Sequence, residues 1–128
     1  MKVLEIGSAH AAGYAGKLLR RWGAEVIRVD DPRIPAPARA EQIAVDLHLH
    51  AGKKRIALDH RALDARDVLH RLAQQCDIVL ADLTADELEG LDWATLGDGG
   101  SRVRAAITPF GLTGPKRQWQ GTSNVLLA

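Results

Sequence analysis

The segment "DLHLHAGKKR", residues 46–55, holds the densest group of side chains that could do chemistry. Asp46, His48 and His50 alternate, so on a strand they would share one face and could bind a metal ion through carboxylate and imidazole groups. Alternating polar residues are also typical of a solvent-exposed strand face, and we expect that role and no metal site. The basic run 53–55 that follows could bind phosphates or be solvated surface.

The turn "GSAHAAG", residues 7–13, lies between an apolar run and the start of a helical pattern. Free N–H groups and the helix dipole at such a turn can bind an anion. The same small residues would also let a helix pack tightly on a sheet, and the sequence leaves both roles open. Gly7, Gly13, Gly16 and the acidic strand end Asp30 outline an NAD(P)-binding oxidoreductase domain, although the turn lacks the G-x-G-x-x-G pattern. That domain is one functional hypothesis.

The remaining reactive residue types suggest no catalytic group. Cys76 is the only cysteine and has no histidine at a useful spacing, so we predict a buried structural thiol. A single cysteine also indicates a reducing, cytoplasmic location. His60 and His70 are predicted to be surface and helix-face residues without partners. No Ser-His-Asp order, zinc motif or Walker sequence is present.

Strands and helices that alternate along the chain must position these residues. The pattern predicts one domain of the α/β class, Rossmann-like, with a mostly parallel sheet flanked by helices. Thr84 and Glu87 have capping-box spacing and predict a short helix. Residues 33–41 are predicted to be a loop. We expect strands near residues 3–6, 24–30, 55–59, 76–83 and 102–110, and two longer helices whose inward faces are Ala11, Ala15, Leu18, Leu19 and Trp22, and Leu63, Val68, Leu69 and Leu72.

The overall composition excludes several classes of protein. The 128 residues are 46% apolar and 26% charged with a net charge of +1, which argues against a nucleic-acid partner. Glu5 interrupts the first apolar run, and no stretch approaches the roughly 20 apolar residues of a membrane span, so we expect a soluble protein without membrane contact. The ending "TSNVLLA" starts a helix that stops within one turn. We therefore expect a piece of a longer protein, with exposed apolar surface at 125–127.

Four blocks in order carry a more specific resemblance: "VLEIG…GYAGKLLRRWGAEVIRVDDP", "GKKRIALD", "LAQQCDIVLADL…ELEGLDWATL" and "ITPFGLTGP". Together they resemble the family III CoA-transferases (the CaiB/BaiF type), which include formyl-CoA and carnitine-type CoA-transferases and the alpha-methylacyl-CoA racemases. The resemblance covers nearly the whole chain. It implies that residues 1–128 are the N-terminal part of a Rossmann-like large domain, in a protein that forms an interlocked homodimer.

The resemblance implies a reaction between acyl-CoA and a carboxylic acid, with no permanently bound cofactor. An aspartate attacks the acyl-CoA thioester, a mixed anhydride forms and the CoA thiolate leaves, so that CoA is exchanged between acids. In the racemase branch a proton beside the thioester carbonyl is removed and returned instead. The aspartate nucleophile of the transferases, and the racemase acid and base, would fall at or beyond the end of this chain. We therefore expect no catalytic residue within it.

The resemblance also implies a CoA-contacting set. His10 and Ala11 would lie near the thioester and pantetheine. Asp82 and Leu83 would line the pantetheine channel. The adenine and phosphates would be held by Leu58, Arg61 and Asp31. Asp82 replaces an asparagine, Asp31 stands where a basic residue would suit the phosphates, and Thr122-Ser123 replaces Tyr-Asp. The carboxylates of Asp82 and Asp31 would repel CoA, which carries roughly four negative charges, unless Arg28, Arg61 or the basic run 53–55 compensates. A non-catalytic nucleotide-binding or interaction domain is a third hypothesis.

Overall fold

A five-stranded, all-parallel sheet forms the centre of the computed structural model, in which residues 1–7, 10–100, 103–119 and 121 are described. The strand order is β3-β2-β1-β4-β5. The strands are β1 (Lys2–Gly7), β2 (Glu25–Asp30), β3 (Lys54–Ala57), β4 (Ile78–Asp82) and β5 (Val103–Ala106), and the helices are α1 (His10–Arg21), α2 (Ala40–His50), α3 (Leu63–Gln74) and α4 (Ala85–Gly90). This arrangement confirms the predicted Rossmann-like α/β fold.

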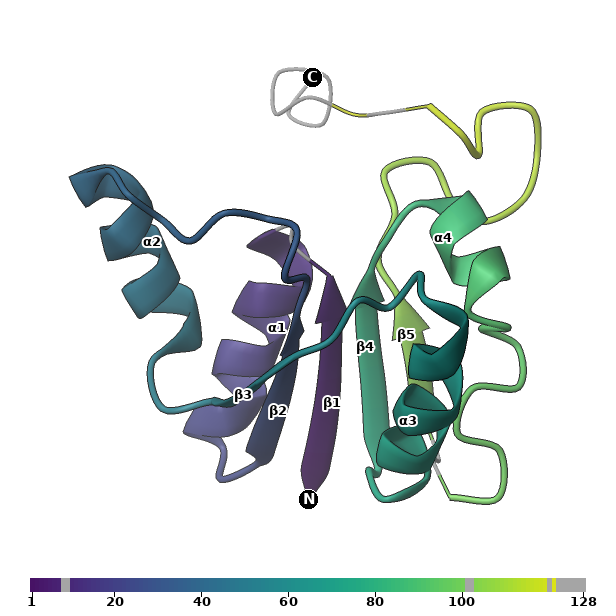
Figure 1. Cartoon of the computed structure of the whole chain (residues 1–128), viewed down its shortest axis with the longest axis horizontal. Coiled ribbons are helices and arrows are strands. Elements are labelled where there is room, and N and C mark those ends of the chain that lie inside the picture. The colour runs from purple at the N-terminus through teal and green to yellow at the C-terminus, as the bar shows by residue number, and fades with distance from the viewer. Residues whose placement is uncertain (8–9, 101–102, 120, 122–128) are drawn as a thin grey trace.

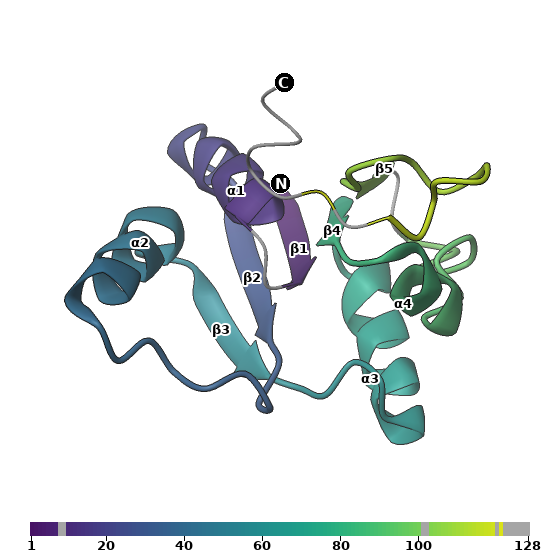
Figure 2. The same ribbon diagram turned by 90° about the horizontal axis from the view of Figure 1, so that it is seen from above.

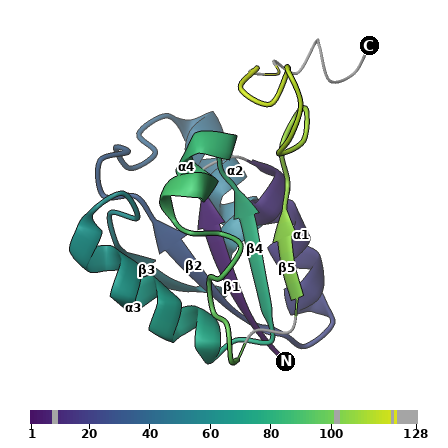
Figure 3. The same cartoon turned by 90° about the vertical axis from the view of Figure 1, so that its right-hand side faces the viewer.

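Helices cover both faces of the sheet. Figure 1 and Figure 2 show α1 and α2 on one side and α3 and α4 on the other, and Figure 3 shows β4 and β5 with α3 and α4 beside them. Alternation along each strand assigns residues to the two faces. In β1, Leu4 and Ile6 join the larger core cluster with Leu69 of α3, whereas Val3 joins Ala12 of α1 in the smaller cluster. Glu5 therefore faces α1, although it is charged and fully buried.

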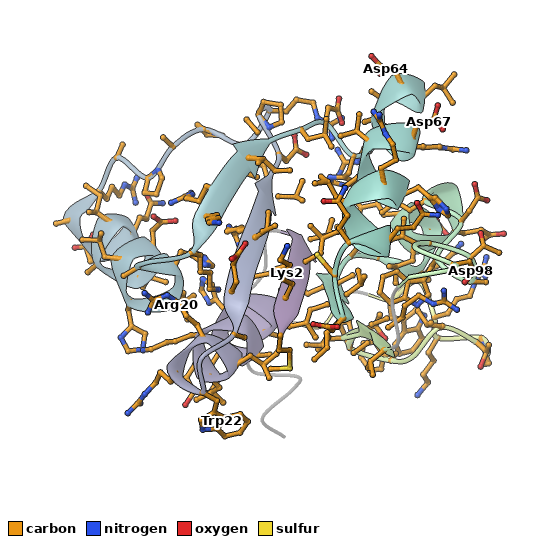
Figure 4. All side chains as sticks on the ribbon, turned by 90° about the horizontal axis from the view of Figure 1, so that it is seen from below. Lys2, Arg20, Trp22, Asp64, Asp67 and Asp98 are labelled. Atoms are coloured by element: carbon orange, nitrogen blue, oxygen red, sulfur yellow. The ribbon has the colours of Figure 1, made fainter. Side chains whose placement is uncertain are left out.

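Three residues expected on the inward faces of helices are exposed, and one of them, Ala11, lies in the first turn of α1. Trp22 is 77% exposed because α1 ends at Arg21, and Figure 4 shows its ring outside the sheet, beyond the end of α1. Leu63 is 78% exposed because it is the first residue of α3. Each of the three lies at an end of its helix or just beyond it, so the periodic pattern overestimates the length of the buried face.

The segment 40–50 is a helix, which corrects our prediction of a loop up to residue 41 followed by an alternating segment. Its alternation covers only residues 46–50, too few to outweigh the helix-forming Ala, Glu and Gln that precede them. None of the helices in the described ranges is long and apolar enough to cross a membrane. The predictions that concern Thr122, Ser123 and residues 125–127 lie outside the described residues.

Candidate functional site

The carboxyl ends of the strands form the edge where a doubly wound sheet binds its ligands. The strand order reverses beside β1, because β2 and β3 are added on one side of it and β4 on the other. Two cavities lie at this edge. We call the smaller one, of about 150 Å³, the edge cavity, and the larger one, of about 810 Å³ and lined mainly by residues 30–38 and α2, the α2 groove. The two share Gly7, Asp31 and Ile34.

The structure brings five of the seven predicted CoA-contacting residues to these cavities. Asp31, Arg61, Asp82 and Leu83 line the edge cavity, and His10 lines the α2 groove. The other two predicted residues line neither. Ala11 is exposed in the first turn of α1, and Leu58 packs against the core while its N–H donates to the carbonyl oxygen of Asp30.

Asp82 lies at the N-terminus of α1, the place where a turn of small residues would hold an anion. Its Oδ2 accepts a hydrogen bond of 2.9 Å from the N–H of Ala12. Gly7 has a φ of 125°, and a Cβ on it would overlap Oδ1 of Asp82. A glycine is therefore required where β1 passes the carboxylate. The first turn of α1 thus receives an anion from the protein itself.

Asp31 and Glu87 place fixed negative charges in the edge cavity. Arg33 donates to Asp31 from its side chain and its backbone N–H, and these bonds lower the pKa of Asp31 to about 2. Burial alone would raise the pKa of Glu87, but hydrogen bonds from Arg61 and Thr84 outweigh it and lower that pKa to about 2. Both groups are therefore ionised at neutral pH, and Arg61 is hydrogen bonded to Glu87.

His60 is buried against the edge cavity, which corrects the prediction of a surface residue. Its Nε2 lies 3.8 Å from Oε1 of Glu87 and has no hydrogen-bond partner within the described part of the chain. No spacing in the sequence distinguishes this histidine. His70 lies on helix α3, as predicted, but it does have partners: its Nδ1 accepts from the N–H of Gly97 and its Nε2 lies 3.1 Å from Nε2 of Gln74.

A buried cluster of charges lies between α1 and the sheet, and no pattern in the sequence predicts it. Glu5 is its centre, with Nζ of Lys53 at 2.6 Å and Nη1 of Arg28 at 2.7 Å. Nζ of Lys53 also donates to the carbonyl oxygen of Gly13 and to Nδ1 of His50. We call Glu5, Arg28, His50 and Lys53 the Glu5 cluster.

The Glu5 cluster explains the helical glycines that suggested NAD(P) binding. A Cβ on Gly13 would lie 2.8 Å from Cε1 of His50, and one on Gly16 would overlap Oε2 of Glu5. These glycines lie beside protein side chains. Asp30, the expected ribose contact, instead accepts hydrogen bonds from Arg28 and Arg55.

The segment 46–55 is likewise occupied by internal contacts. Asp46 accepts from Arg55, His48 bonds with Lys17, and His50 belongs to the Glu5 cluster. Within the described residues no group of three or more His, Cys, Asp or Glu is arranged to hold a metal ion. Of the basic run, Lys53 is buried and Lys54 pairs with Glu25 at the start of β2.

Cys76 is buried, as predicted for a structural thiol. Burial raises the pKa of the thiol, so the thiolate that would act as a nucleophile is disfavoured.

Comparison with known proteins matches this architecture to one family. The model of CoA-transferase family III matches residues 1–128. The chain is 32% identical to cinnamoyl-CoA:phenyllactate CoA-transferase of Clostridium sporogenes over 94% of its length, and 31% identical to succinyl-CoA–D-citramalate CoA-transferase of Chloroflexus aurantiacus over 98%. It covers 32% and 34% of these two proteins, about a third of their length.

A solved structure gives the same result for the fold. The crystal structure of a CAIB/BAIF family protein from Brucella suis superposes with a TM-score of 0.80 at 27% identity, over 98% of this chain and 36% of that one. The sequence blocks, the strand order and the match over the full length agree. The chain belongs to CoA-transferase family III.

Proposed function

We propose that this chain provides the CoA-binding edge of an acyl-CoA transferase that moves CoA between carboxylic acids. The observation that carries the proposal is the convergence of Asp31, Arg61, Asp82 and Leu83 on one cavity at the carboxyl edge of the sheet. These residues come from three separate segments of the chain. Two relatives are named for CoA transfer from an acyl-CoA to a second acid, which supports the same reaction class.

The two cavities suit the two ends of a long ligand. A cavity of about 150 Å³ accepts a single ring. The α2 groove, at about 810 Å³, lies within the usual range of ligand pockets. Because both cavities reach Gly7 and Asp31, we propose that one ligand spans them, with the ribose of its adenosine end in the edge cavity. The pantetheine arm then passes Asp82 and Leu83 toward His10.

The chemical step needs a nucleophile, which we propose lies outside residues 1–128. A carboxylate there would attack the thioester carbonyl, the C–S bond would break, and the thiolate of CoA would leave with its electron pair. The acyl group would remain on the enzyme as a mixed anhydride. The acceptor carboxylate would attack the enzyme's own carbonyl in that anhydride and release the first acid, which forms a second anhydride. The CoA thiolate would then attack the acceptor's acyl carbonyl, form the new C–S bond and release the enzyme carboxylate. The described residues would bind and orient CoA during these steps.

The test uses the full-length protein that contains this chain. CoA at about 100 times its dissociation constant is expected to add about 2.7 kcal/mol to the stability, and NADH none. With an acyl-CoA and a free acid, mass spectrometry should detect the second acyl-CoA. His10→Ala should raise the KM for acyl-CoA about threefold or more, whereas His48→Ala, on the exposed face of α2, should not.

Two results would contradict the proposal. A stability gain with NADH and none with CoA would favour the oxidoreductase hypothesis. Exchange of the α-proton without CoA transfer would indicate a racemase.

A further inference from the structure

Both arginines beside the edge cavity are already paired with carboxylates. Arg61 donates through Nε and Nη2 to Oε1 of Glu87. Nη2 of Arg33 lies 2.7 Å from Oδ2 of Asp31 and 3.0 Å from Oδ1 of Asp59. Within the described residues, each of these guanidinium charges is therefore already balanced by a carboxylate before any phosphate binds.

The lining of the edge cavity carries an excess of negative charge. Three carboxylates line it, those of Asp31, Asp82 and Glu87, against the single guanidinium of Arg61. Arg33 pairs with Asp31 and Arg61 with Glu87, so the lining keeps a net negative charge, and a dianionic phosphate in this cavity would be repelled at short range, where the protein screens charge much less than bulk water does. The cavity therefore disfavours a phosphate and favours a neutral group that donates hydrogen bonds.

His60 indicates that the cavity takes a polar ligand atom. The residue is 5% exposed, and its Nε2 is buried without a hydrogen-bond partner in the described ranges. Buried polar nitrogens are rarely left unsatisfied, and an imidazole nitrogen can accept from or donate to a hydroxyl. Asp31 follows β2, where doubly wound folds use an acidic residue to bind a ribose hydroxyl and an arginine to bind a ribose phosphate.

We infer that the edge cavity binds the ribose of the ligand's adenosine as a neutral ring and does not bind the 3′-phosphate, so that the protein accepts 3′-dephospho-CoA about as well as CoA. The inference rests on the proposed function, because it assumes that the ligand is a CoA compound. Glu87 and Asp31 are the specificity-determining residues. Glu87 pairs with Arg61 and so keeps Arg61 from binding the 3′-phosphate, and the negative charge of Asp31 repels that phosphate.

The experiment measures the dissociation constants of CoA and 3′-dephospho-CoA for the full-length protein by calorimetry. The unmodified protein should bind both within about threefold of each other. Glu87→Gln releases Arg61 and should bind CoA about tenfold more tightly than 3′-dephospho-CoA. Glutamine preserves the capping box with Thr84, so α4 should remain folded. Glu89→Gln, an exposed change on the same helix, should behave like the unmodified protein.

Arg61→Gln provides a second measurement if Glu87→Gln does not fold. This variant should leave the ratio of the two constants unchanged, because Arg61 does not read the phosphate. A preference for CoA of about tenfold or more in the unmodified protein, lost in Arg61→Gln, would overturn the inference while leaving the proposed function intact. Binding of neither compound would overturn the proposed function, and the inference with it.

Discussion

Lys53 and Lys54 are neighbours in the sequence, but their side chains lie in opposite environments. The Lys53 side chain is fully buried and its Nζ lies 2.6 Å from Glu5, whereas the Lys54 side chain is 67% exposed and pairs with Glu25 at 3.0 Å. Successive side chains point to opposite faces where the chain enters a strand. A buried charge that loses its partner is strongly destabilising, and an exposed one is not.

Lys53→Met should therefore lower the free energy of unfolding by about 3–5 kcal/mol, because it leaves Glu5 charged and buried with one fewer cation. Lys54→Met should leave the free energy of unfolding nearly unchanged, since water solvates both members of its pair. Urea unfolding monitored by circular dichroism measures the two values. Equal effects of the two substitutions would show that the Glu5 cluster adds no more to the free energy of unfolding than an exposed ion pair does.

Gly16→Ala tests the space that the Glu5 cluster needs beneath α1. A methyl group there would overlap Oε2 of Glu5, which is buried and hydrogen bonded to Lys53. Overpacking of this kind typically costs about 1–3 kcal/mol, although alanine recovers about 1 kcal/mol of helix propensity. We expect a net loss of stability.

Gly90→Ala is the matched control for Gly16→Ala, because nothing lies within 4 Å of its Cβ position at the end of α4. Thermal melts of the two variants give the comparison. A Gly16→Ala variant as stable as Gly90→Ala would exclude the packing role.

At the scale of elements, the sequence predicted well wherever a local pattern controls the structure. The apolar runs of β1, β2 and β4 and the capping box of α4 formed as expected. In helix α2, residues 46–50 alternate as in a strand, and residues 40–41 continue a Pro- and Ala-rich stretch without a clear period, so neither local pattern predicts the helix.

Contacts between distant segments could not be predicted in this way. Glu5 and Lys53 are 48 positions apart, and so are not related by any helix or strand period. The pairing of Arg61 with Glu87 and the burial of His60 likewise depend on how β3, α3 and α4 are placed together. The resemblance to a family was what identified Asp31, Arg61, Asp82 and Leu83 before the fold brought them to one cavity.

Asp82→Asn tests the junction of β4 with α1. The amide oxygen can still accept from the N–H of Ala12, so α1 keeps its hydrogen bond and loses only the charge at its N-terminus. The lost interaction with the helix dipole should reduce stability by about 0.3–1 kcal/mol. Removing a carboxylate from the lining of the edge cavity should at the same time tighten CoA binding about fivefold in the full-length protein.

Asp86→Asn, on the exposed first turn of α4, is the control and should leave CoA binding unchanged. Weaker CoA binding by Asp82→Asn would mean that the carboxylate assists the ligand instead of opposing it.

At the scale of the whole molecule, the Glu5 cluster joins β1 and β2 to the carboxyl end of α2 and the entry to β3. His50 makes this junction sensitive to pH. Burial, and after it the nearby positive charges of Arg28 and Lys53, lower the pKa of His50 to about 4, although the charge of Asp46 acts in the opposite direction. The folded protein therefore keeps the imidazole neutral, with Nδ1 accepting from Lys53.

The sign of the pH effect follows from proton binding. Below about pH 6.5 the unfolded chain protonates His50 and the folded protein does not, so stability falls as the pH drops toward about 4, by about 3 kcal/mol at most. Asp31 and Glu87, whose pKa values are lowered to about 2, add stability that is lost only at lower pH, between about 4 and 2.

His50→Gln should abolish the first loss and keep the second, because a glutamine oxygen can accept from Lys53 without titrating. His48→Gln, on the exposed face of the same helix, should retain both. Urea unfolding at about pH 7, 6, 5, 4, 3 and 2 measures both losses, and an unchanged slope above about pH 4 in His50→Gln would assign the first loss to other groups.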